Sequence, residues 1–349
     1  MTLVATAMIS ADDIVGEVVY VEGYPDIIRD GDRLYETLDF GFAVHNFDAI
    51  ETDADSLAEI NVDAETGIDA TVVIRPKTQF TLRVSSLRSE QEGILDLLSG
   101  SVGVVVRELT GTSRLALRTH SSVAGVRGTI FDVTTGADGS VLVTAEEGTV
   151  EVAHGSGPLL FAARGEAVEI NPEQLLARNI KYDLATAEFT RQWVLDRLET
   201  LERNPARFVR FYGLRYLAAR ADFDRTYREL MAHREIIDKW IEESRRGVTG
   251  SEDETSAEKT AIGATLAEAT GALFEFENVR LRLEQMRPNV EAVLSSVELA
   301  DIGTAGRMYA VIERDAVMVR RRIATVRFVQ KLFALRNKGE LPDEQSGAE

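Results

Sequence analysis

The first half of the chain alternates between apolar and polar residues in short runs, which is the pattern of half-buried β-strands. Runs rich in Val, Ile and Leu recur over residues 14–172, and turn sequences that contain glycine separate many of them. These turns are Asp30-Gly31, Asp138-Gly139, Glu147-Gly148 and Arg164-Gly165. Glycine supplies the positive φ that tight turns need. No long helical pattern interrupts the runs, so the sequence predicts an N-terminal all-β domain, a sandwich or solenoid of short strands, over residues 14–172.

The second half has a helical pattern, in which apolar residues recur three and four positions apart. Asn171-Pro172 offers an N-cap and a proline for a first helical turn, and Asn204-Pro205 interrupts the pattern. Thr255 and Glu258 have the spacing of a capping box. The sequence therefore predicts an α-helical bundle or hairpin over residues 173–336, packed along two apolar seams: Ile262, Leu266, Ala269, Leu273 and Phe276, and Met308, Ile312, Val319, Ile323 and Val326.

The expected fold class is thus α+β with two domains, and two terminal segments lie outside both. Residues 1–13 contain Ala5-Thr6-Ala7, which fits a signal-peptidase site, and we interpret this segment as a signal-peptide remnant whose start lies upstream. This interpretation predicts a periplasmic or secreted protein. Residues 337–349 are polar and are expected to be a disordered tail.

Charge and composition exclude several classes of function. The chain of 349 residues has 58 acidic and 39 basic residues, a formal net charge of -19. Residues 1–172 hold 28 acidic against 11 basic residues, a net of -17, so we expect no nucleic-acid partner. No run approaches the roughly 18 apolar residues of a membrane span. The absence of cysteine excludes disulfides, thiolate zinc sites and thiol nucleophiles.

Residues capable of catalysis or metal binding are not arranged in a known motif. The histidines at positions 45, 120, 154 and 233 lack metal-ligand spacing, and no phosphate-binding loop or nucleophile elbow is present. The acidic cluster from Asp48 to Asp69 does not fit an EF-hand and is interpreted as a solvated edge. Residues 207–220 interleave arginines with aromatics, as in an amphipathic helix with its aromatics inward. The sequence therefore indicates no catalytic, cofactor-binding or metal-binding residue, and no enzyme.

One stretch carries a specific motif. Its core is Val126-Arg127-Gly128-Thr129-Ile130-Phe131-Asp132-Val133, and Glu147-Gly148 with two alternating valines follows downstream. This arrangement resembles the FecR domain family, and the resemblance extends over about residues 14–172. We interpret the motif residues as structural: Val126, Arg127, Gly128, Thr129, Phe131, Val133, Glu147 and Gly148. Gly128 permits a bulge or close backbone approach within a strand, and Thr129, Phe131 and Val133 share one face of it.

The resemblance implies an extracytoplasmic module. The best-known members are inner-membrane signal transducers that relay the state of iron-siderophore receptors to a sigma factor, and their helical segment precedes the FecR domain. In this chain the helices follow the β-region. We therefore expect a non-enzymatic bacterial envelope binding or scaffold protein whose partner is a protein or a glycan, with the helical half as a candidate surface for homo-oligomer formation. Two alternatives stay open: a FecR-type signalling regulator of iron-uptake transcription, and a carbohydrate-active enzyme on a β-scaffold.

Overall fold

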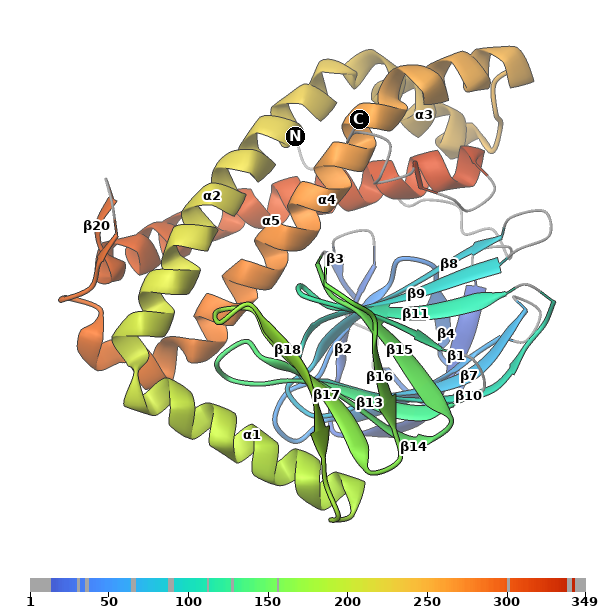
Figure 1. The fold of residues 1–349 in the computed structure, drawn as a ribbon. Helices are drawn as coiled ribbons and strands as arrows, with labels where there is room; N and C mark the ends of the chain where they lie inside the picture. The colour runs from blue at the N-terminus through green and yellow to red at the C-terminus, as the bar shows by residue number, and fades with distance from the viewer. Residues whose placement is uncertain are drawn as a thin grey trace.

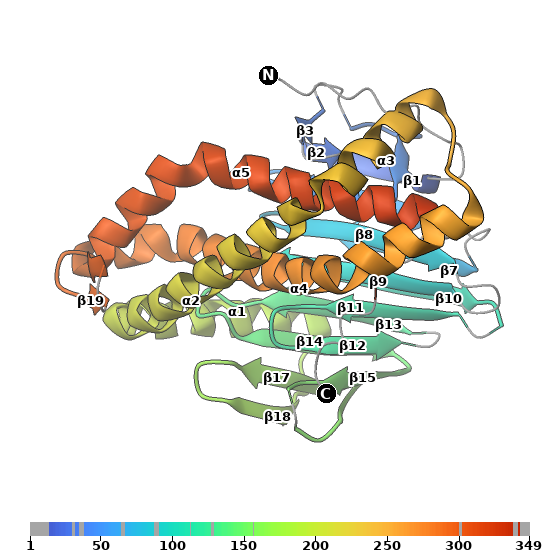
Figure 2. The same cartoon turned by 90° about the horizontal axis from the view of Figure 1, so that it is seen from above.

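The structure is a computed structural model that describes residues 14–29, 32–34, 38–63, 67–86, 91–111, 113–126, 129–155, 157–299, 302–337 and 341–342. It consists of β-structure over residues 14–181 followed by a helical region (Figure 1). The long helices lie on one side of the β-structure (Figure 1), and seen from above they cross over it (Figure 2). The predicted order, an all-β part followed by an α-helical part, is confirmed.

Eighteen strands of the described chain form one hydrogen-bonded sheet. They are β1 (Ile14–Glu22), β2 (Asp26–Arg29), β3 (Asp32–Arg33), β4 (Ala43–His45), β5 (Ala49–Glu51), β6 (Leu57–Val62), β7 (Ile68–Ile74), β8 (Gln79–Ser86), β9 (Gln91–Ser99), β10 (Ser101–Leu109), β11 (Arg114–Arg118), β12 (Val123–Val126), β13 (Ile130–Thr135), β14 (Val141–Glu147), β15 (Thr149–Ala153), β16 (Leu160–Ala163), β17 (Glu166–Asn171) and β18 (Leu176–Lys181).

The sheet curls into a nearly closed barrel. One layer runs β4-β1-β6-β7-β10-β13-β14-β17, and the other runs β16-β15-β12-β11-β9-β8-β5-β2-β3. The hairpin between β16 and β17 joins the layers, and β18 extends the sheet beyond β17. Strands β9 and β11 are parallel, whereas the other pairs of described strands in this path are antiparallel. The inward side chains of both layers make one apolar core.

Strict alternation along the strands explains this core. In β7 the side chains of Ile68, Ala70, Val72 and Ile74 are fully buried, while the residues between them are partly exposed. A strand with period two must turn its apolar face to an apolar partner, and the opposite layer supplies it. The β13–β14 and β16–β17 turns, with Gly139 at φ 84° and Gly165 at φ 75°, are hairpins as predicted.

The turn at Glu147-Gly148 is different from the predicted tight turn. Strand β14 pairs with β13 and β17, whereas β15 pairs with β12 and β16, so the two flanking strands do not form a hairpin. Gly148 has φ 74° and bends the chain from one layer of the barrel to the other. The glycine in the sequence therefore predicted the bend correctly. It did not predict that the strands on either side of the bend pair with other strands.

The helical region contains five α-helices in the described residues and a small hairpin. They are α1 (Thr186–Arg203), α2 (Pro205–Ala232), α3 (Arg234–Arg246), α4 (Glu252–Val290), the 3-10 helix η3 (Glu291–Val293), β19 (Glu298–Leu299), β20 (Gly303–Thr304) and α5 (Ala305–Arg336). Every residue of the two predicted seams is buried in a single helical core, so the seams are confirmed. No helix in the described part of the chain is both long enough and apolar enough to cross a membrane.

Side-chain pairs fix the directions of the three long helices. Arg215 pairs with Glu275 and Arg225 with Glu268, so α2 and α4 are antiparallel. The pairs between α4 and α5 likewise run in opposite order, from Arg287 with Glu313 to Thr270 with Gln330. Helix α1 instead packs on the β-structure, where Trp193 joins Leu142 and Ala167 in a small apolar cluster.

The predicted start of the helical region at residue 173 is wrong. Residues 172–175 are a turn, and β18 follows before α1 begins at Thr186. The Asn171 side chain accepts a hydrogen bond from the Gln174 N–H at 2.9 Å, as an N-cap would, but Leu175 with φ 52° closes a hairpin. The same local hydrogen bond thus serves a helix start or a turn.

The predicted capping box at Thr255 is also wrong. Helix α4 begins one turn earlier, where the Ser251 side chain accepts from the Glu254 N–H. The expected signal-peptide remnant over residues 1–13 lies outside the described residues, as does most of the expected tail.

A candidate binding site where the helices meet the β-structure

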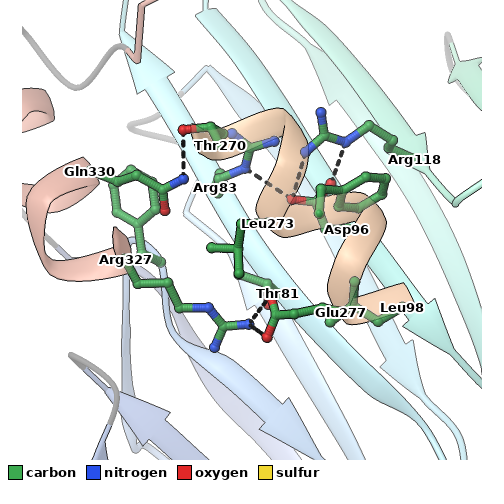
Figure 3. Close-up of a pocket in the computed structure, with 12 residues that line it drawn as sticks. Thr81, Arg83, Asp96, Leu98, Arg118, Thr270, Leu273, Glu277, Arg327 and Gln330 are labelled. Carbon is green, nitrogen blue, oxygen red and sulfur yellow. Dashed lines mark hydrogen bonds and ion pairs between the residues drawn. The ribbon is translucent and has the colours of Figure 1, made fainter. Parts of the chain in front are cut away.

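A buried carboxylate lies on the outer face of the barrel, under helix α4 (Figure 3). Asp96 follows Leu95 and precedes Leu97 on β9; both leucines point into the core, so period two turns Asp96 outward. The register places Arg118 of β11 directly beside it, and Arg83 reaches it from β8. Asp96 accepts hydrogen bonds from Arg118 Nε at 2.7 Å and from Arg83 Nε at 3.0 Å.

The two guanidinium groups decide the charge of this carboxyl group. Burial alone would raise the pKa of Asp96, but the charges and hydrogen bonds of Arg83 and Arg118 outweigh it and hold the pKa below its usual value. The Arg118 guanidinium lies 4.0 Å from the centre of the Phe274 ring of α4, which adds a cation–π contact. Asp96 therefore stays ionised and joins the β-structure to α4 through Arg118.

The pocket around this cluster is a small polar junction. Its volume of about 40 Å³ has room for ordered water but not for an organic ligand. Beside it, Gln330 of α5 donates to the Thr270 hydroxyl at 2.8 Å, and Arg327 pairs with Glu277 at 2.9 Å. These contacts connect α4 with α5 at the same level (Figure 3). The side chains around this pocket thus hold α4 against the barrel and α5 against α4.

The β13–β14 hairpin makes a second attachment. The Tyr212 hydroxyl of α2 donates to the Asp138 carbonyl at 3.1 Å, and Arg282 Nη1 of α4 donates to the Gly136 carbonyl at 2.7 Å. A Cβ atom at Gly139 would overlap the Tyr212 hydroxyl. Burial raises the pKa of Tyr212, so its hydroxyl keeps the proton that it donates.

A large cleft lies between the helices and the β-structure, beside the second attachment. Its volume is about 1020 Å³. One wall consists of helical residues from α1, α4 and α5, and the other consists of turns and strand ends of the β-structure, including the β7–β8, β9–β10 and β13–β14 turns. A concave space of this size between two parts of a protein is a typical ligand site. This cleft is our candidate functional site.

The FecR-like motif is part of the barrel next to the cleft, since Thr134 and Thr135, which follow Val133 on β13, line the cleft. Thr129, Phe131 and Val133 are buried on the core side of the barrel, and the Thr129 carbonyl accepts a hydrogen bond from the Val106 N–H at 3.0 Å. Val126 ends β12, and Gly148 makes the bend between layers with the exposed Glu147 beside it. Arg127 and Gly128 lie outside the described residues. None of the described motif residues lines the cleft.

The other sequence candidates do not form a site. No group of three or more His, Asp or Glu side chains among the described residues is placed to hold a metal ion. Within the acidic segment, the Asp48 side chain is buried and pairs with Arg29 at 2.7 Å. The interpretation of a solvated edge is therefore wrong for Asp48. On α2, Phe208, Tyr212 and Tyr216 are buried in the helical core, as the amphipathic interpretation predicts.

Sequence reasoning missed the cleft because its residues come from separate segments. Lys77 follows Pro76 in the β7–β8 turn, and Arg320 stands on α5. Two carboxylates also line it: Glu51, which accepts from Gln79 and pairs with Arg33, and Glu284, which pairs with Arg280 at 2.6 Å. Burial raises the pKa of Glu51 despite the Arg33 charge. Both carboxylates are thus committed to neighbouring side chains.

Comparison with known proteins identifies part of the chain. A family model described as FecR protein matches residues 48–151. No curated protein matches. Two solved structures of a "putative anti-sigma factor" from Parabacteroides distasonis match with TM-scores of 0.34 and 0.33 and identities of 16% and 15%. These matches cover 42% and 39% of this chain and 64% and 60% of those chains, less than two thirds of their length.

The family match is narrower than the predicted resemblance over residues 14–172. The match begins near β5 and ends in β15. It therefore contains the motif and the central strands of both barrel layers. Strands β1 to β4 and β16 to β18 extend the same sheet beyond it. Residues 48–151 of this chain are therefore a FecR domain.

Proposed function

We propose that this protein is a non-enzymatic binding protein of the bacterial envelope, and that a partner protein or glycan binds in the cleft between the FecR-containing barrel and the helices. The proposal rests on one observation. The helices contact the barrel at two places, yet a cleft of about 1020 Å³ stays open between the helices and the barrel. Buried polar contacts such as the hydrogen bond from Arg282 to the Gly136 carbonyl hold both walls in place. A preformed site lowers the entropic cost of binding.

The FecR match and the N-terminal segment support the envelope location. FecR domains are expected to be extracytoplasmic modules, and Ala5-Thr6-Ala7 fits the end of a signal peptide. Fractionation of native cells checks this part. Recovery in the periplasm or the medium agrees with the proposal, and recovery only in the cytosol contradicts it.

Cross-linking in native cells tests the binding site itself. A photo-reactive amino acid at Gln285, an exposed cleft residue on α4, should capture a defined partner. The same amino acid at Phe161, exposed on β16 outside the cleft, is the control. The result agrees with the proposal if position 285 captures a partner and an excess of protein without the photo-reactive amino acid suppresses this capture. Equal capture from both positions, or none from position 285, contradicts it.

The FecR match also favours a second function, a regulator of transcription that acts through a partner protein. Deletion of the gene should then change a defined set of transcripts under iron limitation. Unchanged transcripts together with a cross-linked partner would favour the scaffold function.

A further inference from the structure

The cleft is positively charged in a strongly acidic protein. Five cations line it, namely Arg33, Lys77, Arg280, Arg282 and Arg320, against the two carboxylates Glu51 and Glu284. Five less two gives a formal charge of +3, whereas the whole chain has -19. A concave surface lined by one sign of charge concentrates ligands of the opposite sign.

Arg282 is the most unusual of these cations. Its side chain is only 4% exposed, and it donates to the Gly136 carbonyl at 2.7 Å. No carboxylate of the described chain lies within ion-pair distance of its guanidinium, although Asp138 acts on its charge from farther away, whereas the largely buried Arg83 has a direct carboxylate partner. Arginine is almost never buried unless it is paired, because an uncompensated buried charge is costly. An anion in the cleft would supply the missing partner.

Lys77 and Arg320 add two further cations without an ion-pair partner in the described structure. Lys77 adopts φ 58°, a conformation that favours glycine, in the turn after Pro76. Its N–H donates to the Asp53 carbonyl at 2.8 Å, which fixes the turn beside the cleft. By contrast, Arg33 and Arg280 are neutralised by Glu51 and Glu284. Three charges are thus free to bind a ligand.

Five of the six hydroxyl groups that line the barrel wall, all but that of Ser99, make hydrogen bonds within the described part of the protein. Thr52 donates to the Arg75 carbonyl and accepts from the Thr78 N–H. Thr78 accepts in turn from the Ser101 N–H at 2.9 Å, and Thr135 accepts from the Gly100 N–H at 2.8 Å. Recognition of a neutral sugar needs free hydroxyls or amides, whereas these hold the turns together. We therefore expect this wall to bind a ligand mainly through charged groups.

We propose that the cleft binds a compact anionic part of its partner, with two or three carboxylate or phosphate groups that Arg282, Lys77 and Arg320 neutralise. Guanidinium groups bind both kinds of oxyanion through paired hydrogen bonds. The acidic surface outside the cleft repels a long polyanion, so a compact ligand is favoured. This inference names the ligand class of the cleft and rests on the binding function proposed above.

Isothermal titration calorimetry of the full chain tests the ligand class. The probes are trigalacturonate, propane-1,2,3-tricarboxylate and pyrophosphate, and neutral maltotriose is the control for trigalacturonate. We expect saturable binding of an anion and none of maltotriose. Binding of the carboxylates alone identifies a carboxylate ligand, and binding of pyrophosphate alone identifies a phosphate ligand. If no anion saturates the protein, or if maltotriose binds equally, the proposal is wrong.

Two substitutions locate the site without disturbing the fold. Lys77→Gly removes a charge and places glycine where φ is positive, so the turn should be preserved. Arg320→Ala removes an exposed cation of the cleft, and Arg321→Ala removes its exposed neighbour outside the cleft. Lys77→Gly and Arg320→Ala should each weaken binding about tenfold, the effect of a lost charge-assisted hydrogen bond. Arg321→Ala should not; an equal loss in that variant would indicate diffuse attraction and overturn the proposal.

The outcomes separate this inference from the proposed function. If Gln285 cross-links a partner in cells but no anion binds, the ligand class is wrong and the binding function stands. If anions bind through Lys77 and Arg320 but no partner is captured, the anion site stands and the envelope-partner function is wrong.

Discussion

At the scale of single residues, the charges between barrel and helices are satisfied to very different degrees. Asp96 has two guanidinium partners and stays ionised. His120, in the β11–β12 turn, has a buried Nε2 without a hydrogen-bond partner. Burial together with the charges of Arg282 and Arg215 lowers its pKa to about 3. A histidine in this position is held neutral by the fold, and it links stability to pH.

We expect His120 to make the protein less stable as the pH falls from about 6.5 to 3. In the unfolded chain histidine takes up a proton near pH 6.5, whereas in the folded chain it does so only near pH 3. Falling pH therefore favours the unfolded state by up to about 1.4 kcal/mol per pH unit. His120→Gln should reduce this slope in urea unfolding measured from pH 4 to 7. A slope identical to that of the unsubstituted protein would show that His120 is not held neutral.

At the scale of elements, the β13–β14 hairpin does more than connect two strands. Its turn is the surface on which α2 and α4 dock, through Tyr212 and Arg282. The turn lies within the FecR domain, so part of this domain positions the helical region. Gly139 is essential to this contact, because its φ is positive and its missing side chain leaves room for the Tyr212 hydroxyl.

Gly139→Ala should destabilise the protein by about 1–3 kcal/mol, through backbone strain and overlap with Tyr212. Gly125→Ala on β12 is the matched control, because nothing lies within 4 Å of a Cβ atom built there. Thermal or urea unfolding measures both. Similar stabilities for the two variants would mean that α2 does not pack tightly on the turn.

Local signals in the sequence predicted elements but not their contacts. The period of two revealed β1, β7, β8, β10 and β11, and the spacing of Leu266, Ala269 and Leu273 revealed a helical seam. The hairpin at Asn171 was mistaken for a helix start because one side-chain hydrogen bond serves both. The cleft could not be predicted, since Lys77, Arg282 and Arg320 are brought together only by packing.

At the scale of the whole molecule, two large apolar cores are joined by polar contacts and by the small apolar cluster around Trp193. The barrel core and the helical core are separate clusters, and Asp96, Tyr212 and Arg282 contribute to the links between them. Interfaces within a chain permit relative motion unless they are extensive or strongly bonded. Here the links include the buried hydrogen bonds of Tyr212 and Arg282 to the β13–β14 turn, and a buried polar group that loses its hydrogen bond is costly. We therefore expect barrel and helices to unfold as one cooperative unit.

The two tryptophans allow this cooperativity to be measured, because one reports on each part. Trp193 of α1 donates to Glu169 of the barrel at 2.8 Å, and Trp240 of α3 donates to Glu258 within the helical region at 2.7 Å. In the single-tryptophan variants Trp240→Phe and Trp193→Phe, fluorescence follows barrel and helices separately. If the molecule unfolds as one unit, a further substitution should shift the urea unfolding midpoint by the same amount in both single-tryptophan variants.

Asp96→Asn provides the perturbation. It leaves Arg83 and Arg118 buried without their anion, which should cost about 3–5 kcal/mol. Because Asp96 lies on β9, a decrease in the Trp240 midpoint equal to that of Trp193 requires coupling between barrel and helices. Asp69→Asn, which breaks the exposed pair with Arg107, is the control and should change both midpoints little. If Asp96→Asn lowers only the Trp193 midpoint, the helices fold independently, and the cleft between them and the barrel is not a rigid site.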